Sequence, residues 1–467
     1  MSKSKNSLIN KTYIHSPLFI KNIFASVYGF LLSKKRRNKH YNETMKLLKK
    51  TEFLSTNELE ILQFPLLKEF LIFSYNNSEF YRTFFDENNF DPEKIISAHD
   101  LKTLPIISRT EVEKNISKIN CSHLFENVKA SQTSGGTRGN PLKLFVTDMC
   151  AQKGEAYISM LYSWYNLKQK LKMAKCAGQV VCSPVKTKPP YWVTDFYNNS
   201  LYMSSFNLSE DNLPHYVNKL EKFKPDVIEG YPSSIYQLAL ATKQYKKHIN
   251  PKFIRTGSET LLDFQKEVIE DAFKCKTHNF YGSGENCVKA IECSHGKIHF
   301  QLLYGYTEFL NELDEPASSG ETARVVATGF SNYAFPLIRY DHDDLVVLSE
   351  NQHCACGRGG IMVDRIIGRI GDYILTPEKK RVSIFSKLFA GLQGIVNAQF
   401  IQNIISEVEL LLVINEKYNK SNEYIIINNA RKTLGNTIQI KLRYVDGIKK
   451  EKNGKYKFII SNLNSSF

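Results

Sequence analysis

A short glycine-rich segment carries the residue types that bind phosphate. Thr133–Pro141 reads Thr-Ser-Gly-Gly-Thr-Arg-Gly-Asn-Pro. Glycines let backbone N–H groups approach phosphate oxygens, and hydroxyl and guanidinium groups add further contacts. The following Leu142–Val146 alternates apolar and polar residues and predicts a strand, whereas a Rossmann or Walker loop would open a helix. The segment therefore fits either a phosphate-binding loop between two strands or a surface turn rich in glycine and serine.

Five further motifs follow in a fixed order: Gly230-Tyr-Pro-Ser-Ser234, Gly257-Ser-Glu259, Tyr281-Gly-Ser-Gly-Glu285, Pro336–Asp344 and Gly368-Arg-Ile-Gly-Asp372. Together with the loop, this ordered set resembles the adenylate-forming enzymes. It is most similar to the branch of phenylacetate–CoA ligase and its capsule-biosynthesis members. The resemblance extends over residues 100–460 and implies ATP and a carboxylic acid as reactants and magnesium as a cofactor.

The resemblance implies roles for individual residues. Glu285 would be a magnesium ligand, and Thr137 would support the phosphates during catalysis. Asp344 would accept hydrogen bonds from both ribose hydroxyls. Arg369 would reach the ribose or a phosphate, and Tyr281 would present its ring to the adenine. Without the order of the motifs, the two carboxylates would be interpreted as solvated loop residues.

The acyl pocket and the catalytic lysine follow from the same resemblance. Tyr231 and Ser233 are expected to line the pocket. Lys455 follows Gly454, and relatives similarly carry a Gly-Lys whose lysine reaches the α-phosphate. Lys452 is the alternative for this role. Most of the lysines near the C-terminus must simply be solvated. The other expected nucleotide-binding residues are Ser134, Gly135, Gly136, Arg138, Gly139, Gly257, Ser258, Glu259 and Gly282.

Three positions depart from the family pattern. Asn140 stands where the loop usually carries Lys, Asp343 replaces the Gly before the ribose-binding Asp, and Gly371 replaces the first Asp after Gly-Arg. Arg138 could supply part of the missing lysine charge. These departures keep a non-catalytic scaffold in polysaccharide assembly as the alternative to an enzyme.

Soft ligands form a second candidate site. Cys293-x5-His299 and Cys354-x-Cys356 together offer three thiolates and an imidazole, a set that suits tetrahedral zinc. Four protein ligands leave no open position, so the role would be structural. Close relatives pair the same spacings. His295 and His353 compete for the histidine position, and four unrelated side chains remain the alternative.

Composition bounds the setting of the protein. The 467 residues exceed one ordinary core and suggest at least two domains. Residues 1–50 carry +11 of the net charge of +15, which argues against a basic face for nucleic acid. Nine scattered cysteines argue against a secreted disulfide framework. With no long apolar run and no signal sequence at the start, we expect a cytoplasmic protein.

The basic N-terminal region predicts an amphipathic helix. Ser16-Pro17 can cap and start it, and Lys34-Lys-Arg-Arg37 ends it. An apolar stripe lies between them: Ile20, Ile23, Phe24, Val27 and Leu31. Such a helix either rests on the anionic inner face of a membrane or docks on the body of the protein with a solvated basic end.

The order of expected elements predicts an α/β fold. The large N-terminal adenylate-forming domain would have mainly parallel sheets, and the small C-terminal domain would be α+β and mobile about Gly368–Asp372. The expected divisions are a mostly helical region at 1–99, a nucleotide- and acyl-binding domain at 100–366 and the C-terminal domain at 367–467. Ligands of open α/β sheets bind beyond the carboxyl ends of strands, and Gly257 and Tyr281 follow such strands.

Local patterns give the individual elements. Strands are expected at Gln179–Cys182, Asp226–Gly230 and Phe253–Arg255, alternating with helices at 233–246 and 261–273. Arg324–Thr328 and Leu345–Leu348 would bracket a loop that holds Asp344. In the C-terminal domain, strands are expected at 407–413, 437–444 and 455–460, with one helix near 421–434.

The expected reaction is ATP-dependent formation of an acyl-AMP and pyrophosphate. The acyl group would then pass to a thiol, most simply that of coenzyme A. The capsule-type resemblance implies a cell-surface polysaccharide pathway, in which an amine, a sugar or a carrier protein would be the alternative acceptor.

Overall fold

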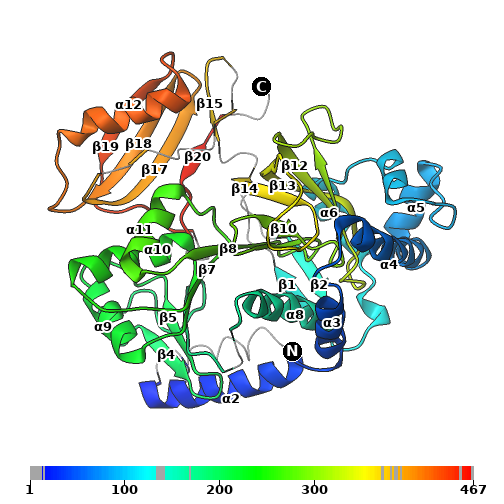
Figure 1. Cartoon of the computed structure of the whole chain (residues 1–467), viewed down its shortest axis with the longest axis horizontal. Coiled ribbons are helices and arrows are strands. Elements are labelled where there is room, and N and C mark those ends of the chain that lie inside the picture. Colours follow the sequence, from blue (N-terminus) through cyan, green and yellow to red (C-terminus); the bar gives the residue numbers. More distant parts are fainter. Residues whose placement is uncertain are drawn as a thin grey trace. The chain divides into compact units, whose positions relative to one another are not determined.

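The chain folds into two compact units, each assembled from separated stretches of sequence. The computed structural model describes Tyr13 and residues 16–132, 142–167, 170–369, 373–378, 381–382, 388–389, 392–451 and 455–463. Unit 1 comprises Met1–Leu31, Gln169–His278 and Gly371–Phe467, and unit 2 comprises Leu32–Lys168 and Asn279–Ile370. Figure 1 shows helices and strands mixed throughout the described chain, which confirms the predicted α/β class.

Unit 1 contains the parallel strands. They lie in the order β7-β6-β3-β5, with β4 antiparallel at the edge. Their bounds are β3 (Met173–Ala177), β4 (Trp192–Asp195), β5 (Ser200–Ser204), β6 (Val227–Gly230) and β7 (Phe253–Thr256). All four residues of β7 are buried, as expected for a central parallel strand covered on both faces.

Three helices follow strands β5, β6 and β7, respectively: α9 (Leu213–Phe223), α10 (Pro232–Gln244) and α11 (Asp263–Phe273). The elements expected at 226–230, 233–246, 253–255 and 261–273 are therefore confirmed. The strand expected at Gln179–Cys182 is wrong, because β3 ends at Ala177 and Val180 is 51% exposed. The alternating burial that defines the strand lies a few residues earlier in the chain.

The C-terminal part of unit 1 is a four-stranded sheet in the order β19-β18-β17-β20. Its elements are β17 (Ile395–Ile404), β18 (Glu407–Ile414), α12 (Asn422–Leu434), β19 (Gln439–Tyr444) and β20 (Ile459–Ser461), preceded by the short pair β15 (Ile374–Leu375) and β16 (Arg381–Val382). Its core is continuous with that of the parallel sheet, since the rings of Phe264 and Phe389 lie 5.1 Å apart. This shared core explains why residues 169–278 and 371–467 form one unit.

Unit 2 contains an antiparallel sheet in the order β11-β12-β13-β14-β10-β9-β8. The strands are β8 (Thr277–Gly282), which starts in unit 1, β9 (Lys289–Glu292), β10 (Ile298–Phe300), β11 (Tyr306–Leu310), β12 (Thr322–Gly329), β13 (Leu337–Leu348) and β14 (Met362–Arg369). Short connections favour hairpin pairing, so the mainly parallel arrangement that we expected is confined to unit 1.

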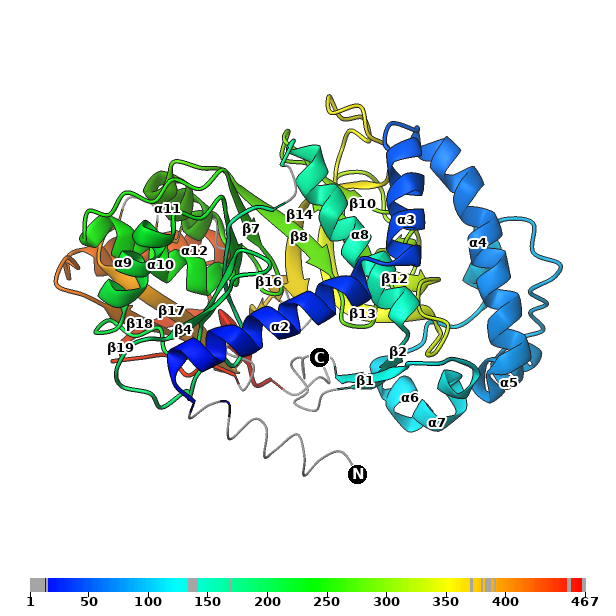
Figure 2. The ribbon, with the colours of Figure 1, turned by 90° about the horizontal axis from the view of Figure 1, so that it is seen from below.

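Helices surround the sheet of unit 2. They are α3 (Lys39–Lys50), α4 (Thr56–Asn77), α5 (Glu79–Glu87), α6 (Arg109–Lys114), α7 (Ile116–Ile119) and α8 (Asp148–Trp164), with short 3₁₀ turns at Ala98–Thr103 and Ser122–Leu124. Ser55 and Glu58 form a reciprocal capping box that starts α4. Figure 2 shows α3 beside α8, and the two helices pack against each other.

Helix α2 (Leu18–Arg36) confirms the expected N-terminal helix, but its polar side faces the body of unit 1. Asn22 Oδ1 accepts the N–H of Thr194 at 2.8 Å, and Ser26 Oγ accepts that of Phe196 at 2.9 Å. Most of the predicted apolar stripe is exposed instead: Ile23, Phe24, Val27 and Leu31 are 53–58% exposed. Within the described residues, no helix is long and apolar enough to span a membrane.

Candidate active site and metal centre

Three sequence motifs meet in unit 2. The phenolic hydroxyl of Tyr281, at the end of β8, donates to Asp344 Oδ2 at 2.7 Å. Arg369, at the end of β14, places Nε 3.7 Å from Asp344 Oδ1. The side chain of Asp344 is 13% exposed, and this burial raises its pKa while the Arg369 charge opposes the rise. A partly desolvated carboxylate oriented by a phenol and a guanidinium is suited to accepting hydrogen bonds from the hydroxyl groups of a ligand.

Glu285 lies next to this cluster in the turn that follows β8. Its side chain is buried, and its charge contributes to raising the pKa of both Tyr281 and Asp344 after the larger effect of burial. Gly282 and Gly284 are exposed on the same turn, so backbone there is open to a ligand. A carboxylate at this place is an oxygen ligand of the kind that magnesium uses, with waters completing its coordination.

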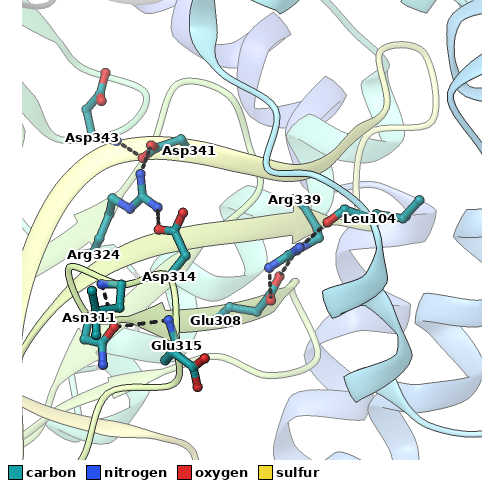
Figure 3. Close-up of polar contacts among 10 residues, drawn as sticks. Leu104, Glu308, Asn311, Asp314, Glu315, Arg324, Arg339, Asp341 and Asp343 are labelled. Carbon is teal, nitrogen blue, oxygen red and sulfur yellow. Dashed lines mark hydrogen bonds and ion pairs between the residues drawn. The ribbon is translucent and has the colours of Figure 1, made fainter. Parts of the chain in front are cut away.

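The substitution of glycine by Asp343 is accommodated locally. Asp343 has a φ of 55°, in the left-handed region that Gly, Asn and Asp enter most readily. Its backbone N–H donates to Asp341 Oδ1 at 2.8 Å, and Arg324 Nη1 donates to Oδ2 of the same carboxylate at 2.8 Å. Figure 3 shows Asp341 between these two donors. The turn that a glycine would permit is thus kept, and Asp344 retains its place.

The loop expected around Asp344 is wrong, because β13 runs through this residue from Leu337 to Leu348. Arg339 explains how the strand is held. Its guanidinium forms a two-point contact with Glu308, with Nε–Oε2 at 2.9 Å and Nη2–Oε1 at 2.8 Å, and it also donates to the carbonyl of Leu104. Figure 3 shows this group apart from Asp341 and its two donors. The arginine of the Ile-Arg-Tyr motif therefore has a structural role.

The glycine-rich loop connects a β-hairpin. β1 (Lys129–Gln132) pairs antiparallel with β2 (Lys143–Val146), so the prediction that the loop lies between two strands is confirmed. Ser134, Gly135, Gly136, Thr137, Arg138, Gly139 and Asn140 lie outside the described residues. Their phosphate contacts stay predictions.

In unit 1, the expected acyl-pocket segment follows β6. A side chain at Gly230 would place its Cβ 2.2 Å from the carbonyl oxygen of Cys176, so only glycine fits here. Tyr231 precedes α10, and Ser233 lies in its first turn with its backbone N–H donating to Glu259 Oε2 at 3.2 Å. The Gly257–Glu259 turn directly follows β7, as expected.

Lys455 lies in the same region of unit 1. Its Nζ is 5.6 Å from the centre of the Tyr231 ring, so the proposed catalytic lysine and the proposed acyl pocket are neighbours. The competing Lys452 lies outside the described residues. Sequence reasoning missed Lys450, whose Nζ donates to the carbonyl of Ser205 and whose pKa burial lowers to about 8. Its position among many tail lysines offered no signal.

The four soft ligands form a compact cluster in unit 2. Their ligand atoms all lie within 4.8 Å of one another. Cys293 Sγ is 3.6 Å from Cys354 Sγ, and Cys356 Sγ is 3.5 Å from His299 Nε2. Zinc bonds of about 2.3 Å to sulfur and about 2.0 Å to nitrogen, at tetrahedral angles, require separations of roughly 3.5–3.8 Å. The residues therefore fit zinc, and the sulfurs are too far apart for a disulfide.

The surroundings of the cluster fix the histidine. His299 Nδ1 lies 3.0 Å from the carbonyl oxygen of Gly359, which favours a proton on Nδ1 and leaves Nε2 free for a metal. Trp164 packs edge-on against the His299 ring. The guanidinium carbon of Arg358 lies over the Trp164 ring, 4.4 Å from its centre, and the same guanidinium forms an ion pair with Glu52. His295 and His353 are not part of the cluster that the described residues form.

Known proteins are similar to this chain in sequence and in fold. A family model of the CapK C-terminal domain matches residues 374–462. Protein CapK of Staphylococcus aureus is 27% identical over 465 residues, covering 98% of this chain and 100% of that protein. The phenylacetate-coenzyme A ligase of Thermus thermophilus is 23% identical over 353 residues, covering 69% of this chain and 73% of that protein.

Solved structures extend the likeness. The 2-hydroxyisobutyryl-CoA ligase in complex with R3-HIB-AMP superposes with a TM-score of 0.70 at 16% identity, covering 89% of this chain and 92% of that chain. Together, the fold and the sequence relatives define an adenylate-forming ligase. The chain is similar to the branch of the adenylate-forming superfamily that includes CapK and the phenylacetate-coenzyme A ligases.

Proposed function

We propose that this protein couples a carboxylic acid to ATP, forming an acyl-adenylate, and passes the acyl group to a thiol, most simply that of coenzyme A. The observation that carries the proposal is the convergence of Tyr281, Asp344 and Arg369 beside Glu285. Three residues expected to bind nucleotide and the expected magnesium ligand lie in one place, which supports ATP as the co-substrate.

The first step joins two anions. An oxygen of the substrate carboxylate attacks the α-phosphorus of ATP, a P–O bond forms, and the bond to the β-phosphate breaks with release of pyrophosphate. Asp344 would bind the ribose and so orient the α-phosphate. Glu285 would hold magnesium, which supplies positive charge to the phosphates when bound.

Lys455 would offset the negative charge that develops as the carboxylate approaches. Loss of one preorganised contact of this kind typically costs about 10²–10³ in rate. We therefore expect Lys455→Ala to slow adenylate formation by this factor and to spare transfer from a chemically prepared acyl-adenylate. Equal loss in both half-reactions would assign Lys455 a structural role.

In the second step, a thiolate attacks the acyl carbonyl, a C–S bond forms, and AMP leaves with the electrons of the C–O bond. The match to CapK over nearly the whole length of both proteins supports a setting in capsule or surface polysaccharide biosynthesis. In that setting an amine, a sugar or a carrier protein is the alternative acceptor, and a screen of acceptors against the preformed adenylate distinguishes them.

The direct test of the proposal is pyrophosphate release with ATP and a panel of aryl, fatty, amino and sugar acids. Glu285→Ala should abolish acid-dependent release, whereas Glu87→Ala, an exposed glutamate at the end of α5, should leave it unchanged. If no acid gives turnover and ATP does not bind at millimolar concentration, the non-catalytic scaffold is the better interpretation.

Two accessory features belong to the proposal. We assign zinc to Cys293, His299, Cys354 and Cys356, with a structural role, because the four side chains leave no open coordination position. We also propose a peripheral contact of α2 with anionic lipid. Its exposed apolar stripe and the three basic residues of its last turn support that contact.

A further inference from the structure

One carboxylate in unit 1 joins two segments that are far apart in the sequence. Glu259 Oε2 accepts the backbone N–H of Ser233, in the first turn of α10, at 3.2 Å. Its other oxygen, Oε1, accepts the backbone N–H of Tyr456 at 3.1 Å. The second donor directly follows Lys455, the residue that we assign to adenylate formation.

The segment around Lys455 is attached at several further points. The phenolic oxygen of Tyr456 lies 3.4 Å from Gln237 Nε2 of α10, and the N–H of Glu451 donates to the carbonyl of Lys455 at 2.8 Å. Further along, the carbonyl of Lys457 accepts from Gln399 Nε2 at 2.8 Å. The contact with Glu259 ties the backbone beside Lys455 to the turn that follows β7.

We propose that Glu259 is a positioning residue that holds the backbone at Tyr456 and thereby sets Lys455 beside Tyr231 for adenylate formation. The inference rests on the proposed function and adds a role for the Gly-Ser-Glu turn beyond nucleotide binding. Glu259 acts through the backbone, so it places the lysine without touching the reacting atoms.

The chemistry of the side chain explains why a carboxylate is needed. Two acceptor oxygens face two N–H donors, and hydrogen bonds to a charged acceptor are stronger than neutral ones. An amide at this position would offer one oxygen to one donor and present its NH₂ group to the other. Glu259→Gln therefore keeps the size of the side chain, loses one of its two contacts and, without the charge, weakens the contact that remains.

The first test measures the contact itself. Hydrogen–deuterium exchange of the full-length protein, without ligands, should show faster exchange of the Tyr456 amide in Glu259→Gln. Glu270→Gln is the matched control, because Glu270 Oε1 also accepts a backbone N–H, that of Thr277 at 2.8 Å, elsewhere in unit 1. Unchanged exchange at Tyr456 in Glu259→Gln would overturn the proposal, whether or not the enzyme is active.

The second test measures the consequence. Glu259→Gln should slow pyrophosphate release by about 10–100-fold, the range expected for one lost charge-assisted hydrogen bond. Transfer from a prepared acyl-adenylate should change less than about twofold on the same grounds. In a Lys455→Ala background the same substitution should add little, because both changes remove one effect. Fully additive losses, or equal losses in both half-reactions, would overturn the positioning role.

The two tests separate this inference from the proposed function. Absence of pyrophosphate release from the unmodified protein with every acid would contradict the proposed function, and the exchange measurement would still decide whether Glu259 holds Tyr456. Normal pyrophosphate release by Glu259→Gln, together with faster exchange at Tyr456, would show a contact without a role in positioning and would overturn the inference alone.

Discussion

Tyr281 and Asp344 are 63 positions apart in the chain, yet the phenolic hydroxyl of one donates to Oδ2 of the other at 2.7 Å. The contact joins the end of β8 to the middle of β13 and so connects two motifs that were recognised separately in the sequence. It gives the Asp344 carboxylate a fixed orientation before any nucleotide arrives. Preorganisation of this kind reduces the cost of binding.

The first prediction concerns this hydrogen bond. Tyr281→Phe keeps the ring that would face the adenine and removes only the donor to Asp344. We expect ATP to bind about tenfold more weakly, in line with the loss of one hydrogen bond to a charged group. Calorimetric titration with MgATP measures the effect. Tyr424→Phe, an exposed tyrosine of α12, is the control. Equal affinity in Tyr281→Phe and the unmodified protein would show that Asp344 needs no orienting donor.

The second prediction concerns the metal. Purified protein should contain about one zinc per chain, as one closed tetrahedral site requires. Because such sites form together with the fold, Cys356→Ser should lose the zinc and lower the melting temperature. Cys275→Ser changes a cysteine outside the cluster and should retain both. We would measure the metal content by mass spectrometry and the melting temperature with and without a chelator. Metal-free protein with an unchanged melting temperature would contradict the assignment.

Local patterns were sufficient for part of this site. The Cys-x5-His and Cys-x-Cys spacings identified all four clustered side chains, because each pair lies within one short connection of the chain. Tyr281, Glu285 and Asp344 were likewise identified from their motifs. The substitution at Asp343 could not be evaluated from sequence, since its acceptability depends on a positive φ and on the Asp341 side chain.

Long-range relationships were beyond the sequence. The two acceptor contacts of Glu259 depend on how residues 233, 259 and 456 fold together, and backbone donors carry no sequence signature. The orientation of α2 was missed for a related reason. An apolar stripe normally predicts the buried side of a helix, but Asn22, Ser26 and Gly29 make the contacts with unit 1.

The third prediction is a pH dependence of stability. His278 is buried and its ring stacks on Phe253 at 4.6 Å; burial, helped by Lys266 and Lys276, lowers its pKa to about 4. The unfolded chain, with a histidine pKa of about 6.5, then binds the proton more readily than the folded protein. Stability should therefore fall as the pH drops below about 6.5, by about 2 kcal/mol between pH 7 and pH 5.

His278→Phe keeps the stacked ring and removes the titrating group. The free energy of unfolding in urea should depend less on pH in this variant than in the unmodified protein. His248→Phe changes an exposed histidine of the same unit and should leave the dependence as it is. His342, whose pKa burial lowers to about 3, acts in the same direction and is present in all three proteins. Parallel curves for the three proteins would contradict the prediction.

The last prediction concerns α2. Its outward side carries large apolar groups, with Phe19 and Tyr28 each 65% exposed in addition to the predicted stripe. Residues 1–42 contain no acidic side chain, and the last turn of the helix carries Lys34, Lys35 and Arg36. An exposed apolar face on a basic helix is typical of helices that lie in the surface of an anionic membrane. We expect the protein to float with vesicles that contain phosphatidylglycerol.

Salt and mutation should separate the two contributions to that binding. Lys35 pairs with Asp148 at 2.7 Å and Arg36 with Glu155 at 3.8 Å, so part of the basic charge is neutralised within the protein. Binding should weaken at high salt without vanishing, because screening acts on the charges and not on the apolar stripe. The double substitution Ile23→Gln and Val27→Gln introduces a residue that favours helix and should abolish flotation at any salt concentration. Leu313→Gln, which changes an 83% exposed leucine of unit 2, should float like the unmodified protein.

Absence of flotation at low salt would contradict the membrane contact. Analytical ultracentrifugation tests the other occupant of the stripe. A dimer that the double substitution abolishes would assign the stripe to a second copy of the chain instead.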